Sequence, residues 1–226
     1  MKPGIRNTVL ILLIVVFSIA AGSFFSIKNK MAEKEGAKQA EMQKFAGIQG
    51  NILSPVRKIS VPFLIKQDGS PFTIESLQGH WSILFFGFTN CGHICPTAMS
   101  VLAQAKKIAQ DKNLEFPDVF MISVDPERDT PAAMEKFMAS FDRDFTGVTG
   151  DAKLLKALSL QMSVIYMRAA SNNKEGQTEN DDNYQVDHSS SFLLMDKQGN
   201  LVAFLNPPHS PEKVLKDIRT IIDASK

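Results

Sequence analysis

One apolar run constrains the fold of this chain more than any other feature. Residues 81–88 read WSILFFGF, with Ser82 as the only polar side chain. A run of this kind is typical of a strand buried on both faces of a sheet. Residues 119–124, which read VFMISV, have the same character, and each run is followed by apolar residues at helical spacing. Strands that alternate with helices predict an α/β fold, a mostly parallel sheet flanked by helices.

Other segments carry signals for the remaining elements. Pro96 and Pro131 each mark the first turn of a helix, and Asp129 and Thr130 stand at the start of the second one. Asp151 and Pro211 begin two further predicted helices. Strands are expected at residues 61–65, with Pro62 indicating an edge, at 164–167, and as a hairpin of 191–195 and 201–205 around a turn at 197–200. Residues 169–182 are polar and predict a mobile loop.

The N-terminus predicts a membrane anchor. No charged residue occurs from Asn7 to Ile27, and such a length at about 1.5 Å per residue matches a hydrocarbon core of roughly 30 Å. A cleaved signal peptide is the alternative, with Ser18 to Ala20 as an acceptable cleavage site, but its apolar region is usually about 7–15 residues. Since a large domain translocates whatever its charge, we expect the short basic end to stay in the cytoplasm and the domain to be exported.

This interpretation divides the chain into three parts. Residues 1–27 form the anchor, residues 28–53 a polar stalk or linker, and residues 54–226 the globular domain. The protein would then be a single-pass protein of a bacterial inner membrane, with its soluble domain in the periplasm. Lys and Arg number 25 against 24 Asp and Glu, and there is no basic block, so nucleic-acid binding is not expected.

The only two cysteines, Cys91 and Cys95, directly follow the first apolar run. Ligand sites of α/β sheets lie at the carboxyl ends of strands, where these residues are expected. Residues four apart share one face of a helix, and helix N-terminal amides favour a thiolate. Such a pair suits Cu(I), zinc or reversible disulfide formation, while two structural thiols remain the alternative.

A metal bound by two sulfurs would need another ligand, and the chain has four histidines. His80 precedes the strand and is expected at its opposite end, and His209 is expected in a loop. His93 stands two positions from each cysteine, so in a helical turn it should point away from both. His188 lies between the polar loop and the strand predicted at 191–195. None of the four is chosen by spacing alone.

Four segments together resemble the Sco/SenC family. They are FGFTNCGHICPT at residues 86–97, ISVDPERDTP at 122–131, FTGVTG at 145–150 and VDHSSSF at 186–192. The resemblance implies a thioredoxin-like fold and copper bound by Cys91, Cys95 and His188, as Cu(I) or Cu(II). It also implies redox-active thiols at Cys91 and Cys95. Asp125 and Arg128 are expected to organise the turn before the helix that starts at Pro131 rather than to bind metal.

The family resemblance also implies a function. A member would deliver copper to the binuclear copper centre of cytochrome c oxidase subunit II, or reduce the cysteines of that centre. Its further partners would be a copper donor protein or a thiol reductant. A thiol–disulfide oxidoreductase without metal is the alternative. The chain departs from the family at Gly92 and His93, where an acid commonly follows a proline, and this leaves the role of His93 open.

Overall fold

The protein is described by a computed structural model that covers residues 23–33, 35–36, 44–169, 185–188 and 190–225, with the backbone alone for 167–169 and 185–188. The chain forms two compact units, Met1–Gly47 and Ile48–Lys226. In the first unit, residues 23–33 are helical. No helix of the described residues is both long and apolar enough to cross a membrane. The anchor predicted at 1–27 falls mainly on residues 1–22, which lie outside the described residues.

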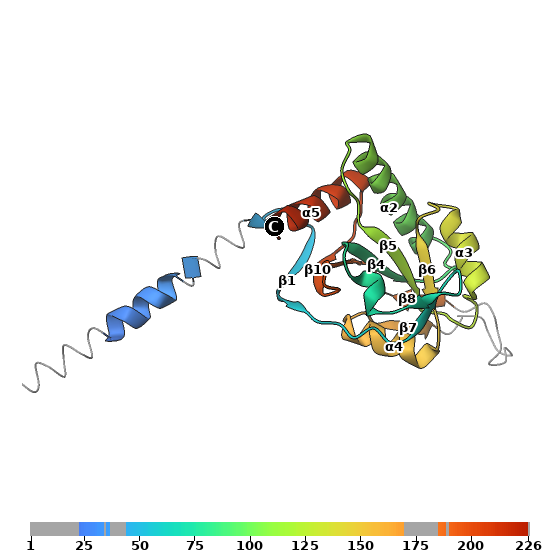
Figure 1. The fold of residues 1–226 in the computed structure, drawn as a ribbon, viewed down its shortest axis with the longest axis horizontal. Coiled ribbons are helices and arrows are strands. Elements are labelled where there is room, and N and C mark those ends of the chain that lie inside the picture. Colours follow the sequence, from blue (N-terminus) through green and yellow to red (C-terminus); the bar gives the residue numbers. More distant parts are fainter. Residues whose placement is uncertain (1–22, 34, 37–43, 170–184, 189, 226) are drawn as a thin grey trace, which may run out of the picture. The chain divides into compact units, whose positions relative to one another are not determined.

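The second unit is built on an eight-stranded sheet (Figure 1). Its strand order is β1-β10-β9-β4-β5-β6-β2-β3. The strands are β1 (Gly50–Arg57), β2 (Leu64–Lys66), β3 (Pro71–Phe72), β4 (Ser82–Gly87), β5 (Asp118–Ser123), β6 (Thr146–Thr149), β9 (Phe192–Met195) and β10 (Leu201–Leu205). Two further strands, β7 (Tyr166–Ala169) and β8 (Gln185–His188), form a separate two-stranded sheet with each other.

The sheet is mixed, and the prediction of a mostly parallel sheet was wrong. Among the strands that the structure describes, only β4 with β5 and β5 with β6 are parallel neighbours. The hairpin of β9 and β10 lies antiparallel against β4, and β1 adds antiparallel to β10. At the other edge β2 pairs antiparallel with β6 and β3. Strands joined by a short turn must be antiparallel, so the predicted hairpin already argued against a mostly parallel sheet.

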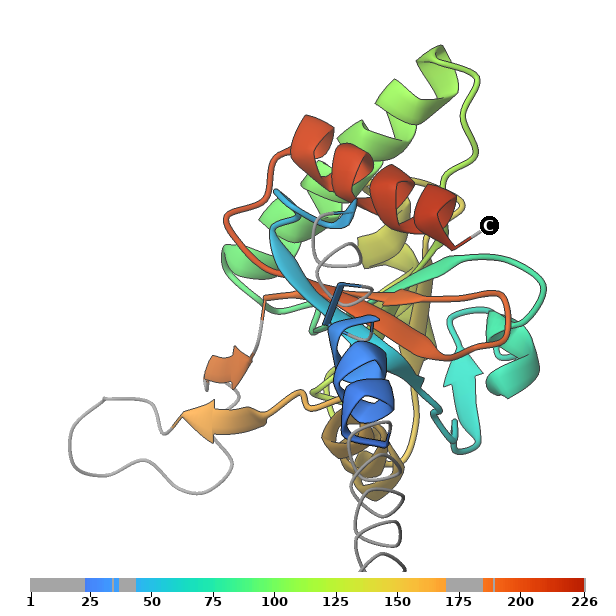
Figure 2. The ribbon, with the colours of Figure 1, turned by 90° about the vertical axis from the view of Figure 1, so that its left-hand side faces the viewer.

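Helices lie on both sides of the sheet, as predicted (Figures 1 and 2). The helices are α2 (Ile94–Asp111), α3 (Pro131–Ala139), α4 (Ala152–Gln161) and α5 (Pro211–Ala224), with a 3₁₀ helix η1 (Ile74–Leu77). Right-handed crossovers from β4 to β5 and from β5 to β6 place α2 and α3 on the same face. Helix α5 packs against α2 on that face, while α4 lies on the other.

Most predicted helix starts are confirmed. The Thr130 side chain caps α3 by accepting from the amide of Ala133, with Pro131 in the first turn. Asp151 caps α4 by accepting from the amides of Lys153 and Leu154. Helix α2 starts at Ile94, two residues before the predicted start at Pro96.

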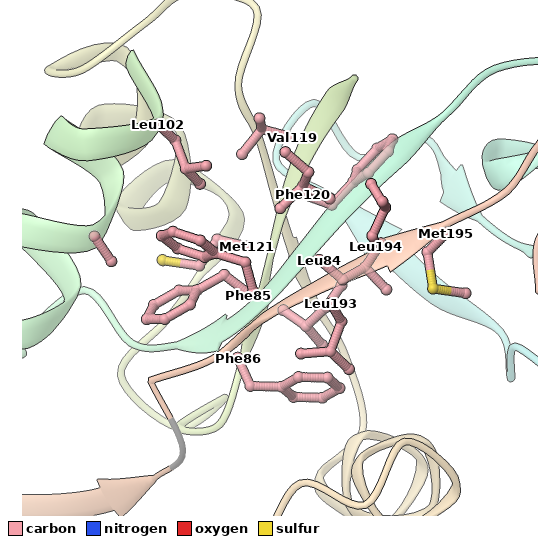
Figure 3. Close-up of a cluster of buried hydrophobic side chains, with 14 of the residues drawn as sticks. Leu84, Phe85, Phe86, Leu102, Val119, Phe120, Met121, Leu193, Leu194 and Met195 are labelled. Carbon is pink, nitrogen blue, oxygen red and sulfur yellow. The ribbon is translucent and has the colours of Figure 1, made fainter. Parts of the chain in front are cut away.

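The centre of the core is strand β4, in which every residue is buried. Figure 3 shows Phe85 and Phe86 leaving β4 on opposite sides, with Phe85 directed towards α2. The prediction that both faces of this strand are covered is therefore confirmed.

Strands β1, β3, β6 and β8 were not predicted, and β1 begins at Gly50, before the expected domain start at residue 54. Residues 170–182 of the predicted loop lie outside the described residues.

Candidate metal centre

Both cysteines lie at the carboxyl end of β4, where the sequence placed them. The chain leaves β4 at Gly87, and α2 begins at Ile94 with His93 as its N-cap residue. The neighbouring strand β5 ends at the same edge, and the amide of Val124 donates to the carbonyl of Gly87 at 2.9 Å. The two loops that follow β4 and β5 therefore start side by side.

The cysteine side chains form an asymmetric pair of thiols that are not joined in a disulfide. Cys91 is partly exposed, whereas Cys95 is completely buried in the first turn of α2. The backbone amide of Cys95 points at Cys91 Sγ, with the nitrogen 3.4 Å from the sulfur. An N–H donor at a helix N-terminus favours negative charge on the sulfur that it faces. The hydrogen bond with Cys91, followed by burial, raises the pKa of the Cys95 thiol far above its usual range. Cys95 therefore keeps its proton until metal binding or disulfide formation removes it.

Gly87 makes room for the buried sulfur. A Cβ atom at this position would lie 2.8 Å from Phe85 Cε1 and 3.0 Å from Cys95 Sγ. Real Cβ atoms essentially never come within 3.0 Å of a neighbour. The glycine at the end of β4 thus lets α2 approach closely enough to bury Cys95 against the strand.

Asp129 holds the loop that leads to Cys91. Its Oδ1 atom accepts from the amide of Thr89 at 3.0 Å and from the Thr89 hydroxyl at 2.6 Å. Its Oδ2 atom accepts from the Ser123 hydroxyl at 2.6 Å. Asp129 is fully buried, and this burial raises the pKa of its carboxyl group despite the three hydrogen bonds. The carboxyl thereby ties the loop after β4, two residues before Cys91, to the end of β5.

Two neighbouring residues complete this turn. The carboxylate of the buried Asp125 forms an ion pair with the guanidinium of Arg128. Arg128 also lies over the ring of Phe88, 5.8 Å from its centroid. The expected organising role of Asp125 and Arg128 agrees with these contacts. The sequence pattern indicated only a place for Asp129 at the start of α3, and not its bonds to Thr89 and Ser123. The available signal was that Asp129 closely follows the buried strand β5, at the edge of the sheet where a site is expected.

Three of the four histidines have described side chains. His80 lies at the opposite end of β4, as predicted, with Nε2 3.2 Å from a carboxylate oxygen of Asp118. His93 is exposed, and its Nδ1 atom lies 3.4 Å from the hydroxyl of Thr97, one turn along α2. The Nε2 atom of His209 lies 2.9 Å from the carbonyl oxygen of Ser190. His209 is in a loop, as expected, but it is packed rather than free.

His188 is the last residue of β8, and its backbone pairs with Tyr166 of β7. Its side chain is outside the described part of the chain. Among the described residues, no three His, Cys, Asp or Glu side chains are grouped closely enough to hold a metal ion. The structure brings Cys91 and Cys95 together, and the third predicted ligand stays a prediction.

Comparison with known proteins gives consistent matches. A sequence model of the SCO1/SenC family matches residues 54–223. An SCO2-like protein of Rickettsia prowazekii is 34% identical over 194 residues, which is 85% of this chain and 87% of the relative. The crystal structure of Arabidopsis thaliana ScoI with copper bound is 33% identical at a TM-score of 0.64, covering 74% of this chain and 99% of that protein. Yeast Sco1 with copper bound is 29% identical at the same TM-score, with 74% and 90% covered.

Proposed function

Because the chain belongs to the SCO1/SenC family, whose solved members have a thioredoxin-like fold, we propose that it is a copper chaperone for the assembly of cytochrome c oxidase. Copper is then the cargo of the protein rather than a resident cofactor. The observation that carries this proposal is the Cys91–Cys95 pair, with the Cys95 amide directed at Cys91 Sγ. Two relatives with solved copper complexes, from Arabidopsis and yeast, support the choice of metal.

The cysteine pair has the chemistry that copper requires. Thiolates are soft ligands that select Cu(I), and the two thiols, which form no disulfide, are adjacent to one helix N-terminus. A metal ligand must be deprotonated, and the raised pKa of Cys95 means that the ion must displace a firmly held proton. We therefore expect copper uptake to release protons and to weaken as the pH falls.

We propose His188 as the third ligand, following the family resemblance of the segment VDHSSSF. Imidazole accommodates both Cu(I) and Cu(II), so two thiolates and one imidazole can hold either state. Three protein ligands leave a position open for a ligand of the acceptor. The acceptor proposed here is subunit II of cytochrome c oxidase, and a copper donor protein would load the site.

The setting of the protein is part of the same proposal. A membrane anchor at residues 1–27, followed by a stalk that ends before β1, would hold the domain on the periplasmic side of a bacterial inner membrane. The predicted stalk of residues 28–53 is shortened here because β1 and the compact unit that begins at Ile48 belong to the domain. The uncharged run from Asn7 to Ile27 supports this arrangement. The anchor would keep the metal centre close to an oxidase in the same membrane.

Thiol–disulfide exchange is the second candidate, and the asymmetry of the two cysteines favours it. The more exposed Cys91 can attack a disulfide of a partner and release one partner thiol. The buried Cys95 then attacks the Cys91 sulfur and releases the second. The Cys91–Cys95 pair is oxidised to a disulfide, and two electrons and two protons pass to the partner. This reaction needs no metal and could prepare the cysteines of the copper acceptor.

A competition titration tests the ligand assignment. His188→Ala should bind Cu(I) and Cu(II) much more weakly than wild type, while Cys91 and Cys95 should still form a disulfide on oxidation. His80→Ala is the matched control, because His80 lies at the other end of β4 beside Asp118. Equal copper affinity in His188→Ala and wild type would exclude His188 as a ligand. Loss of affinity in His80→Ala as well would show a general effect on folding.

A further inference from the structure

We infer that Thr89 is a positioning residue for the cysteine pair, because its contact with Asp129 fixes the backbone that carries Cys91. This inference rests on the proposed role of Cys91 and Cys95 as the copper-binding and redox-active thiols. Thr89 belongs to residues 88–91, the turn that leads from β4 to the first cysteine. The line of contacts from Asp129 to both sulfur atoms runs wholly through residues that the structure describes.

Both donors of Thr89 reach a single oxygen atom. The backbone amide of Thr89 donates to Asp129 Oδ1 at 3.0 Å, and its hydroxyl donates to the same atom at 2.6 Å. Asp129 is itself held, because its side chain is fully buried and its Oδ2 atom accepts from the Ser123 hydroxyl at the end of β5. Two bonds to one fixed acceptor therefore tie both the backbone and the side chain of Thr89 to the sheet.

The turn that contains Thr89 reaches both sulfur atoms. The amide of Cys91 donates to the carbonyl of Phe88 at 3.3 Å, which closes the turn. The backbone amide of Phe88 donates a hydrogen bond to the Cys95 sulfur, while the Cys95 amide points at Cys91 Sγ. Such donors favour the thiolate, which is the form of cysteine that binds a metal ion. A displacement of Thr89 would therefore move the backbone of Cys91 and a donor to Cys95 at the same time.

The segment that follows Cys91 borders open space. A Cβ atom at Gly92 would meet no atom within 4 Å apart from its chain neighbours, and the side chain of His93 is exposed. Glycine also has more backbone freedom than any other residue. The segment after Cys91 is therefore less constrained than the turn before it. The contact between Asp129 and Thr89 then matters more for the place of the first sulfur atom.

Thr89 acts behind the ligand Cys91 rather than at the metal. Removing a residue that orients a metal ligand in this way typically weakens metal binding by roughly 10-fold to 100-fold. Thr89→Val removes the hydroxyl donor but keeps the branched shape and the amide bond to Asp129, so we expect Cu(I) binding about 10-fold weaker. Asp129→Ala removes the acceptor of both bonds and should weaken Cu(I) binding by about 100-fold. Thr89→Ser keeps the hydroxyl and should bind copper as wild type does.

Competition titration of Cu(I) and the absorption spectrum of the Cu(II) form test the inference together. In Thr89→Val the affinity should fall, and the sulfur-to-copper charge-transfer band should change because the geometry at Cys91 determines it; Thr89→Ser should restore both. Thr130→Ala is the matched control, since it removes the cap of α3 next to Asp129 without touching Thr89, and it should keep the affinity and the band of wild type. Adding Thr89→Val to Asp129→Ala should cause no further loss, because the bond is already absent.

The outcomes separate this inference from the proposed function. Wild-type affinity and an unchanged band in Thr89→Val, beside loss of copper binding in Cys91→Ser, would overturn the positioning role and keep the cysteine pair as the centre. An equal loss in Thr130→Ala would overturn it as an effect of general stability, and additive losses in the double variant would show that Thr89 acts independently of Asp129. Wild-type affinity in Cys91→Ser would instead refute the proposed centre. If Thr89→Val does not fold, Asp129→Ala tests the same contact, and wild-type affinity there would overturn the inference.

Discussion

Replacing Asp129 tests how the loop before Cys91 is held. Asp129→Ala removes the acceptor of three hydrogen bonds, from the amide and hydroxyl of Thr89 and from the hydroxyl of Ser123. Hydrogen bonds to a charged group contribute about 1.5–3 kcal/mol each, so three amount to at least about 4.5 kcal/mol. The raised pKa of Asp129 shows that burying the carboxylate offsets part of this gain. We therefore expect Asp129→Ala to lower the free energy of unfolding by about 3 kcal/mol.

Asp129→Asn is the matched variant. Its amide oxygen can accept from both Thr89 donors, and its amide nitrogen can donate to the Ser123 hydroxyl, so all three contacts can be kept. We expect a loss of only about 1 kcal/mol. Urea unfolding followed by circular dichroism measures both variants, with the urea dependence expected to match wild type. Equal losses in the Ala and Asn variants would show that the charge matters rather than the bonds. A loss below about 1 kcal/mol in Asp129→Ala would refute the role of Asp129 in holding the loop.

Three further predictions concern the same region. Gly87→Ala should lower the free energy of unfolding by about 1–3 kcal/mol, because the added methyl group displaces Phe85 or the Cys95 sulfur. The same displacement should make Cys95 react faster with a thiol reagent. Unchanged stability and reactivity would show that the space over Gly87 is larger than described. Burial raises the folded-state pKa of Asp129 above its unfolded value, so the folded state binds the proton first. Wild type should therefore gain stability relative to Asp129→Asn as the pH falls through that folded-state pKa, which urea unfolding at a series of pH values measures; a relative loss would contradict the shift. His93→Asp should leave the Cu(II) spectrum unchanged, since the His93 ring is exposed and lies beside Thr97, and a changed spectrum would place His93 among the ligands.

The sequence correctly predicted the central strand and the position of the cysteines at its carboxyl end. Residues 81–88 are apolar on both faces, and a strand of this kind is stable only when both faces are covered. Helix α2 follows with its apolar residues on one side. The strand order was not visible. Strand β9 of the antiparallel hairpin pairs with β4, and this pairing joins residues more than 100 positions apart. The pattern of apolar residues within one segment does not indicate which distant strand it pairs with, so the sheet was predicted as mostly parallel.

The long-range contacts of Asp129 and His209 were harder to predict than the position of the two cysteines. Asp129 stands one position before the cap of α3, where an acid is common, and its bonds to Thr89 span 40 positions. His209 follows two prolines, which indicates a loop and says nothing of a partner at Ser190. In both cases the local pattern had an ordinary explanation, and the contact that matters comes from the fold. The family motifs supplied His188, which spacing alone did not select from four histidines.

X-ray absorption on protein loaded with Cu(I) tests the central claim most directly. The spectrum reports the number of sulfur and imidazole nitrogen ligands around the metal without depending on a reference affinity. For wild type we predict two sulfur ligands and one imidazole nitrogen, and for His188→Ala two sulfur ligands without that nitrogen. A wild-type spectrum with fewer than two sulfur ligands would contradict a centre built on Cys91 and Cys95, and an unchanged nitrogen signal in His188→Ala would contradict His188 as its third ligand.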